Sequence, residues 1–315
     1  MKARGPSRTG APKATSFGRS LLGIESLDRR RILDLLRLAR RLDRPRPPQL
    51  LRGRHIVLLF YEPSTRTRVS FERAAQTLGA STSLVQATAS SIEKGESLLD
   101  TGRTLRAEGA DAIVIRHPSS GAPHLLAQHL DIPVINAGDG MHEHPSQALL
   151  DAYTILQYKK KLDGLRVAVI GDIYHSRVAR SDIHLLSRFG AQLTLCGPPG
   201  LVPEVAVTLA PGLRLTRVLH DAITGAEVIM LLRVQKERFA GTEFRPESYA
   251  AEYQLTPDRL RLARRDAIVM HPGPRVRGME VIDAVADGPQ SVILHQVRNG
   301  VAVRRAILAW ALRKA

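Results

Sequence analysis

Short apolar runs alternate with stretches of helical periodicity along most of the chain, and the alternation occurs in two successive series. The first series has apolar runs at residues 55–60, 83–87, 111–115 and 132–136. The second series has them at residues 165–170, 192–196, 213–217, 227–232 and 267–270. Strands that alternate with helices form parallel sheets through right-handed crossovers. The pattern therefore predicts an α/β fold with two doubly wound parallel-sheet domains.

The helical stretches predict how these domains are joined. Helices are expected at residues 27–42, with Ser26 as N-cap, and at 67–78, 98–107 and 123–130. A longer helix at 145–161 joins the two domains, and a last helix at 301–314 is expected to pack back on the first. We predict a basic tail at residues 1–17, a first domain at 18–152, a second at 153–300 and the C-terminal helix at 301–315.

Composition excludes several classes of protein. Hydrophobic residues make up 43% and charged residues 24%, which is ordinary for a globular chain and argues against a wholly disordered one. No apolar run approaches the ~20 residues that a membrane helix needs, so no membrane partner is expected. The single cysteine, Cys196, excludes an intrachain disulfide and a cysteine-based zinc cluster.

The net charge of +16 is concentrated at the front of the chain. Residues 1–54 hold 15 Lys and Arg against 4 Asp and Glu, whereas the remaining residues are nearly balanced. Three interpretations stay open: a disordered tail, a targeting segment, or a nucleic-acid contact. Glycines and prolines at 5, 6, 10, 12 and 18 disfavour a targeting helix, so we favour a plain tail, no nucleic-acid partner and a cytoplasmic location.

Polar segments follow the predicted strands in both series. In doubly wound sheets, ligands bind beyond the carboxyl ends of the strands, so these segments are expected to meet at one edge. They are rich in arginine, histidine and hydroxyl groups, which predicts binding of small anions. The segments lie at residues 62–68, 116–118, 138–147, 171–177, 233–238 and 271–274.

The segment Ser64-Thr65-Arg66-Thr67-Arg68 lies between a strand and a helix. A helix N-terminus offers unpaired N–H groups and a partial positive charge, and arginines bind phosphate oxygens in pairs. The alternative is simple N-capping with solvated arginines. The position after a strand favours anion binding, and the absence of a GxxxxGK[ST] sequence excludes a P-loop.

The segment His144-Pro145-Ser146-Gln147 follows a Gly-Asp-Gly turn. A neutral histidine can donate to a carbonyl oxygen, and a glutamine amide can bind a neighbouring NH₂ group. Metal binding through His142 and His144 and a purely structural role for His144 remain alternatives. No clear carboxylate-backed ligand set accompanies these histidines, so no metal is predicted.

Two further segments are less specific. Residues 90–96, with Ser90 and Lys94, form a polar loop that could place a lysine over an anion, although a solvated loop is the simpler interpretation. Arg177 and the 233–238 segment supply guanidinium groups that suit a dicarboxylate. Surface salt bridges with Glu237 or Asp182 are the alternative for these arginines.

Taken in order, these segments resemble the transcarbamoylase family from about residue 20 to the C-terminus. The Ser-Thr-Arg-Thr-Arg and His-Pro-x-Gln motifs imply carbamoyl phosphate as the donor. Ornithine-specific members have a His-Cys-Leu-Pro segment where this chain has His271-Pro272-Gly273-Pro274. Together with Arg177 and Arg233-Val234-Gln235, this likeness implies L-aspartate as acceptor, in the pyrimidine-forming branch of the family. Another acceptor, or an inactive assembly paralogue, is the alternative.

The resemblance also implies a role for each residue. The phosphate would bind to Ser64, Thr65, Arg66, Thr67 and Arg116, with Ser90 and Lys94 supplied by a neighbouring subunit of a homotrimer. Thr67, Arg116 and His144 would polarise the carbonyl, and Gln147 would bind the carbamoyl amine. The aspartate would contact Arg177, Arg233, Gln235, Gly273 and Pro274, and Glu62 would bridge to Arg177 and Arg238 on domain closure.

The same resemblance implies the rest of the chemistry. Carbamoyl transfer from phosphate to an amine proceeds without a covalent enzyme intermediate, and neither an organic cofactor nor a metal is implied. Regulatory or dihydroorotase-type partner chains are left open. The segment Pro274-Arg275-Val276-Arg277-Gly278 departs from the Pro-x-Asn-Arg-Gly that the family often has, so the hydrogen bonding of this loop is not carried over.

Overall fold

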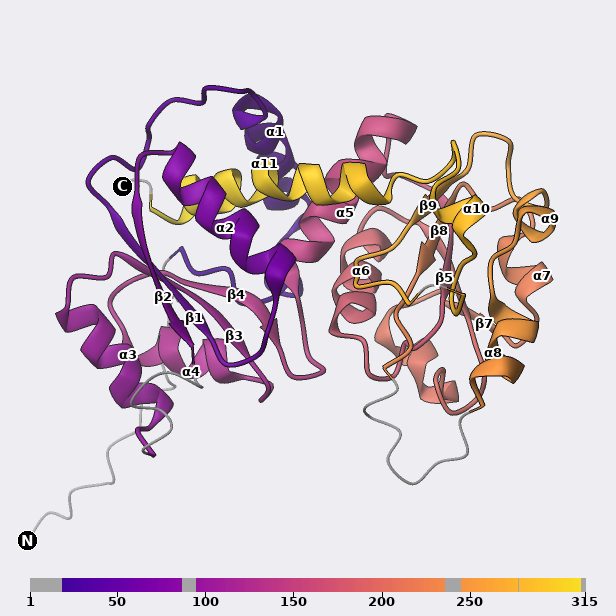
Figure 1. Ribbon diagram of the computed structural model, residues 1–315, viewed down its shortest axis with the longest axis horizontal. Coiled ribbons are helices and arrows are strands. Elements are labelled where there is room, and N and C mark those ends of the chain that lie inside the picture. Colours follow the sequence, from indigo (N-terminus) through magenta and orange to yellow (C-terminus); the bar gives the residue numbers. More distant parts are fainter. Residues whose placement is uncertain (1–18, 87–94, 236–244, 277, 313–315) are drawn as a thin grey trace, which may run out of the picture.

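The first half of the chain forms a four-stranded parallel sheet. The computed structural model describes residues 19–86, 95–235, 245–276 and 278–312. The sheet has the strand order β2-β1-β3-β4, with crossover helices between successive strands (Figure 1). Its strands are β1 (His55–Phe60), β2 (Ser81–Gln86), β3 (Ala112–His117) and β4 (Val134–Asp139).

Helices cover both faces of this sheet. Alternate residues of β1 face opposite sides: Ile56 and Leu58 join the large core cluster, whereas Val57 and Leu59 join a second cluster. The large cluster contains residues of α1 (Arg29–Leu42) and α2 (Thr65–Thr77). The second cluster contains residues of α3 (Leu98–Ala107) and α4 (Ala122–His129). Both faces of β1 are therefore apolar, as expected for a parallel strand buried on two sides.

The second half forms a five-stranded parallel sheet in the order β7-β6-β5-β8-β9. Its strands are β5 (Arg166–Ile170), β6 (Gln192–Cys196), β7 (Arg214–Thr216), β8 (Val228–Leu231) and β9 (Ile268–Met270). The order reverses at β5, which pairs with β6 on one side and β8 on the other. Its helical segments are α6 (Arg177–Ser187), η3 (Glu204–Leu209), α7 (Leu219–Ile223), α8 (Pro246–Tyr253), α9 (Pro257–Leu260) and α10 (Asp283–Ala286).

Two long helices connect the halves. Helix α5 (Pro145–Lys159) leaves β4 and packs against α6, and α11 (Ile293–Ala311) runs from the second half back over α1, α2 and α5 (Figure 1). The predicted fold class is confirmed: two doubly wound parallel sheets with a returning C-terminal helix. The boundaries at residues 152 and 300 stay predictions.

Two sequence-based expectations about helix starts are wrong. Helix α11 begins at Ile293 rather than at 301, because Gly300 continues the helix, where the Arg304 guanidinium occupies the space that a Cβ would take. Helix α1 is capped by Asp28, whose carboxylate accepts from the N–H of Arg31, and not by Ser26. No helix among the described residues has the length and apolar run that a bilayer crossing requires.

Candidate active site

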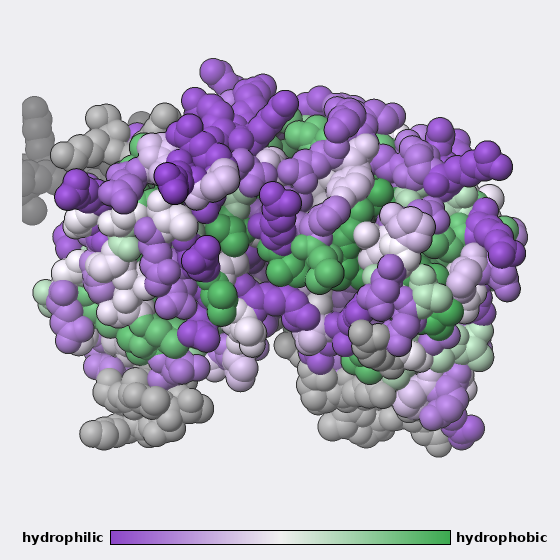
Figure 2. Space-filling model, turned by 45° about the horizontal axis from the view of Figure 1, so that its top comes forward, coloured by the Kyte–Doolittle hydropathy of each residue, from purple (hydrophilic) through white to green (hydrophobic). Residues whose placement is uncertain are grey.

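A cleft of about 340 Å³ lies at the carboxyl ends of both sheets. Figure 2 shows a notch between the two halves of the molecule, with hydrophilic residues at its inner end. All of the predicted polar segments reach the cleft: those at the ends of β1, β3, β5, β8 and β9 and the one around the start of α5. This is expected, because ligands of doubly wound sheets bind beyond the carboxyl ends of the strands. The predicted residues that line it are Ser64, Thr65, Arg66, Thr67, Arg116, His144, Gln147, Arg177, Arg233, Gln235, Gly273 and Pro274.

The N-terminus of α2 faces the cleft. Ser64 is the N-cap residue, yet its side chain makes no capping hydrogen bond, and the first turn contains no acidic residue. The capping interpretation therefore does not apply to Ser64. Because the first N–H groups of a helix lack intrahelical partners, this end is suited to an anion, which the neighbouring Arg66 can also contact.

One carboxylate links two arginines of the cleft. Glu62 Oε2 accepts from Arg177 Nη2 at 2.5 Å and lies 3.2 Å from Arg116 Nε. Burial, together with the positive charges of Arg177 and Arg233, lowers the pKa of Arg116 to about 10, although Glu62 acts in the opposite direction. Arg116 stays protonated at neutral pH, so the cleft keeps an excess of positive charge despite Glu62. Glu62 thus joins the two halves, since Arg177 begins α6 and Arg116 lies in β3.

His144 is buried at the start of α5. Its backbone N–H donates to Ser181 Oγ at 2.8 Å, which anchors the turn to α6. Burial lowers the pKa of His144 well below its ordinary value, and the charges of Arg116, Arg177 and Arg304 act in the same direction. The imidazole is therefore neutral at physiological pH, with one ring nitrogen able to donate to a carbonyl oxygen.

The second half supplies the other wall. Gln235 donates from Nε2 to the carbonyl of His175 at 3.1 Å, and its backbone N–H donates to Asp172 at 3.3 Å. His175 also lines the cleft and places Nδ1 3.0 Å from Asp172 Oδ1. Sequence reasoning assigned no role to His175 or Asp172. Their position directly after β5 was the signal that could have identified them.

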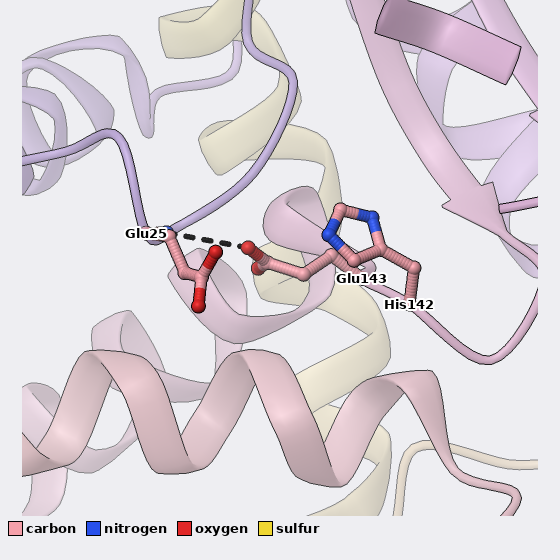
Figure 3. Close-up of side chains that lie close together, drawn as sticks. All are labelled: Glu25, His142 and Glu143. Carbon is pink, nitrogen blue, oxygen red and sulfur yellow. Dashed lines mark hydrogen bonds between the residues drawn. The ribbon is translucent and has the colours of Figure 1, made fainter. Parts of the chain in front are cut away.

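The structure does not support the metal interpretation of His142 and His144. Among the described residues, the cluster that could hold an ion is Glu25, His142 and Glu143 (Figure 3). Glu143 already accepts from the N–H groups of Ile24 and Glu25 and from Ser181 Oγ. His142 Nδ1 faces Asp139 at 3.1 Å. These contacts fasten residues 24–25 to the start of α5, and His144 takes no part in the cluster.

Asp182 also differs from the sequence-based interpretation. It is buried on α6 and pairs with Asp151, so it is not a surface carboxylate. The predicted residues Ser90, Lys94 and Arg238, together with Glu237, lie outside the described residues.

Family models cover almost the whole chain. One, described as aspartate/ornithine carbamoyltransferase, carbamoyl-P binding domain, matches residues 19–157. The second, aspartate/ornithine carbamoyltransferase, Asp/Orn binding domain, matches residues 163–311. The chain belongs to the aspartate/ornithine carbamoyltransferase family. This membership confirms the family predicted from the sequence motifs.

Individual members of the carbamoyltransferase family are similar over nearly their full length. The aspartate carbamoyltransferase catalytic subunit of Koribacter versatilis is 62% identical over 94% of this chain and 98% of that protein. That of Solibacter usitatus is 55% identical over 91% of this chain and 97% of that protein.

Solved structures of carbamoyltransferases have the same fold. Aspartate transcarbamoylase from Trypanosoma cruzi with N-(phosphonacetyl)-L-aspartic acid superposes with a TM-score of 0.87, at 35% identity, over 94% of this chain and 96% of that chain. Ornithine carbamoyltransferase from Pyrococcus furiosus has a TM-score of 0.82, at 30% identity, over 94% of this chain and 97% of that chain. Since both acceptor classes share the fold, the fold alone does not select the acceptor.

Proposed function

We propose that the chain is an aspartate carbamoyltransferase. It transfers the carbamoyl group of carbamoyl phosphate to the α-amine of L-aspartate, giving N-carbamoyl-L-aspartate and phosphate in pyrimidine biosynthesis. The observation that carries the proposal is the convergence of Arg66, Arg116, Arg177 and Arg233 on one cleft between the two sheets. Three anionic groups, one phosphate and two carboxylates, match this concentration of positive charge.

The donor is assigned to the first half of the chain. The phosphate binds at the N-terminus of α2 through Ser64, Thr65, Arg66 and Thr67, with Arg116 opposite. Thr67, Arg116 and the neutral His144 donate to the carbonyl oxygen, where negative charge develops during attack. Gln147 binds the carbamoyl amine.

The acceptor is assigned to the second half. Arg177 and Arg233 bind the two carboxylates of aspartate, Gln235 supports them, and the backbone at Gly273 and Pro274 faces the α-amine. An ornithine side chain would bring an ammonium group beside these guanidinium groups, and like charges at such short range repel. Positive charge in the acceptor wall therefore supports aspartate over ornithine.

The reaction needs no nucleophile from the protein. The α-amine of aspartate attacks the carbamoyl carbon, the C–N bond forms and the bond to the phosphate oxygen breaks. One proton of the amine leaves with the phosphate, which departs as hydrogen phosphate. Donors fixed before the reaction stabilise the charge on the carbonyl oxygen and then on the leaving phosphate. Holding both substrates in one cleft supplies proximity.

The protein is further proposed to be a cytoplasmic homotrimer with shared active sites, in which Ser90 and Lys94 enter the site of a neighbouring chain. Glu62 and Arg238 would contribute to domain closure. These assignments are based on the resemblance of the 90–96 and 233–238 segments to those of the family.

The function is tested by an acceptor screen. Purified protein, carbamoyl phosphate and L-aspartate should yield carbamoyl aspartate and phosphate, whereas ornithine should yield no citrulline. Turnover of ornithine equal to or above that of aspartate would contradict the acceptor assignment.

The shared site is tested by mixing two inactive variants, Arg66→Ala and Lys94→Ala. In a closed trimer, each mixed assembly contains one site with both residues intact, so random equal mixing should restore about a quarter of wild-type activity. Native mass confirms that subunits have exchanged. Exchange without recovery would show that each site is built within one chain.

A further inference from the structure

Asp151 lies one helical turn after Gln147 on α5, behind the wall of the cleft. It is 1% exposed, so it does not contact a ligand in the cleft directly. Gln147 Nε2 donates to Asp151 Oδ1 at 3.0 Å and lies 3.3 Å from Oδ2. The mechanism proposed above uses Gln147 and leaves Asp151 without a role.

A carboxylate fixes which end of a side-chain amide can face it. An ionised carboxylate only accepts hydrogen bonds, so only the NH₂ end of Gln147 can turn towards Asp151. The opposite end of the amide, the oxygen Oε1, is thereby left for the cleft that Gln147 lines. The contact therefore makes Gln147 an acceptor towards a bound substrate.

Asp151 orients a second amide in the same way. Gln296 of α11 donates from Nε2 to Asp151 Oδ1 at 2.7 Å, and its Oε1 accepts from the backbone N–H of His271 at 2.9 Å. His271 Nδ1 in turn accepts from the N–H of Gly273 at 2.9 Å. Through these hydrogen bonds, Asp151 connects Gln147, on the carbamoyl phosphate side of the cleft, with the 271–274 loop on the aspartate side.

The groups around Asp151 favour its ionised, accepting form over ionisation of its neighbour Asp182. Burial raises the pKa of Asp151 to about 7, while hydrogen bonds from Gln296 and Gln147 and the charge of Arg304 oppose this. Burial raises the pKa of the neighbouring Asp182 well above its usual range, and the charge of Asp151 adds to that effect. Asp151 is therefore the carboxyl of the pair that ionises first, and Asp182 holds the proton.

We propose that Asp151 is a positioning residue that fixes the oxygen of the Gln147 amide towards the donor substrate and so selects a carbamoyl group over an acyl group of the same shape. The inference rests on the proposed function. An NH₂ group and a methyl group have nearly the same size, and they differ in that NH₂ donates hydrogen bonds. An acceptor at this point favours the carbamoyl group, whereas an amide turned the other way would place its own NH₂ against that of the substrate.

The test is the nearly isosteric substitution Asp151→Asn. Asparagine presents an NH₂ group as well as an oxygen, so the Gln147 amide is free to turn over. Acetyl phosphate and inorganic phosphate, which both lack the amine, serve as competitive inhibitors. Their inhibition constants are measured against carbamoyl phosphate at saturating aspartate. We expect kcat/KM for carbamoyl phosphate to fall about tenfold or more, with both inhibition constants within about twofold of wild type.

Asp182→Asn is the matched control. Its NH₂ group still donates to Asp151, so carbamoyl selectivity should stay at the wild-type value. Asp151→Ser, which removes the charge but creates no crowding, is a second variant with the same expected loss of selectivity if Asp151→Asn does not fold. In a Gln147→Leu background, Asp151→Asn should cause no further loss of selectivity, because its effect passes through Gln147.

A general structural defect would weaken the binding of carbamoyl phosphate and of both competitors to a similar extent, and this result would overturn the inference. Unchanged kcat/KM for carbamoyl phosphate in folded Asp151→Asn would also overturn it. Absence of carbamoyl-phosphate turnover in the wild type would instead contradict the proposed function, so the two failures are distinguishable.

Discussion

The replacement of Gly273 by alanine should impair donor binding far more than stability. Gly273 has φ +71°, and a Cβ placed on it would lie 2.6 Å from Arg66 Cζ and 2.9 Å from Arg66 Nε. Ordinary contact begins near 3.4 Å, so the guanidinium must move by about 0.8 Å. Because Arg66 is an exposed, flexible side chain, it can move, and the overlap is relieved at the expense of its position.

Two effects of the substitution can be separated. A non-glycine residue with positive φ costs about 1–2 kcal/mol of stability, which corresponds to a few degrees in Tm. Displacement of a binding group by about 1 Å can reduce activity by about 100-fold. We therefore expect kcat/KM for carbamoyl phosphate to fall by about 10- to 100-fold, measured from initial rates of carbamoyl aspartate formation at saturating aspartate.

Gly164→Ala provides the control for backbone strain. Gly164 has φ +63° and nothing within 4 Å of its Cβ position, so its replacement should lower Tm similarly and leave the kinetics unchanged. Suppose Gly273→Ala shows the Tm loss of the control together with wild-type carbamoyl phosphate kinetics. The position of Arg66 beside Gly273 would then be irrelevant to donor binding, and the reasoning would be refuted.

Arg233→Ala should raise KM for aspartate much more than KM for carbamoyl phosphate, and equal increases would contradict its acceptor role. EDTA should leave activity unchanged. Glu143→Gln should lower the free energy of unfolding by about 2 kcal/mol, because the buried Ile24 N–H and Ser181 hydroxyl would lose a carboxylate acceptor. Asp182→Asn should gain stability relative to wild type as pH rises from 5 to 8, measured by Tm. Folded wild type keeps the Asp182 proton at pH values above the ordinary carboxyl pKa, so its stability falls as the pH rises above that ordinary value. An unchanged Tm difference would show that Asp182 ionises normally.

The fold class could be predicted because the chain alternates apolar strands and helices with little interruption. The expected limits of β1 and β6 match the structure, since each is a short run with several apolar residues. The start of α11 could not be predicted in this way. Gly300 resembles a helix end in the sequence, and its role depends on the buried Arg304 side chain, whose guanidinium occupies the space beside it.

The composition of the cleft could be predicted because the carboxyl ends of parallel strands meet at one edge. The rule locates residues at or beyond the carboxyl ends of strands, such as Arg116 at the end of β3 and Arg177 at the start of α6, and the structure brings these together. It does not rank them, so His175 and Asp172 received no role although both follow β5. Roles depend on which atom each side chain turns to the cleft, and that orientation is set by neighbours from other elements.

The Asp151–Asp182 pair shows why the support of the site is less predictable than the site itself. The two carboxyls lie on α5 and α6, and each taken alone in the sequence resembles a solvent-exposed helix residue. They become buried because α5 packs against α6 and α11, and neither helix carries a signal that this contact will exclude water. Two buried, ionised carboxylates would repel each other, so the pair is stable only if Asp182 holds a proton. Arg304 and the amides of Gln147 and Gln296 stabilise the charge on Asp151. This requirement connects three helices at one point behind the cleft. Selectivity for the carbamoyl group is thus expected to depend on packing between helices that never touch the substrate.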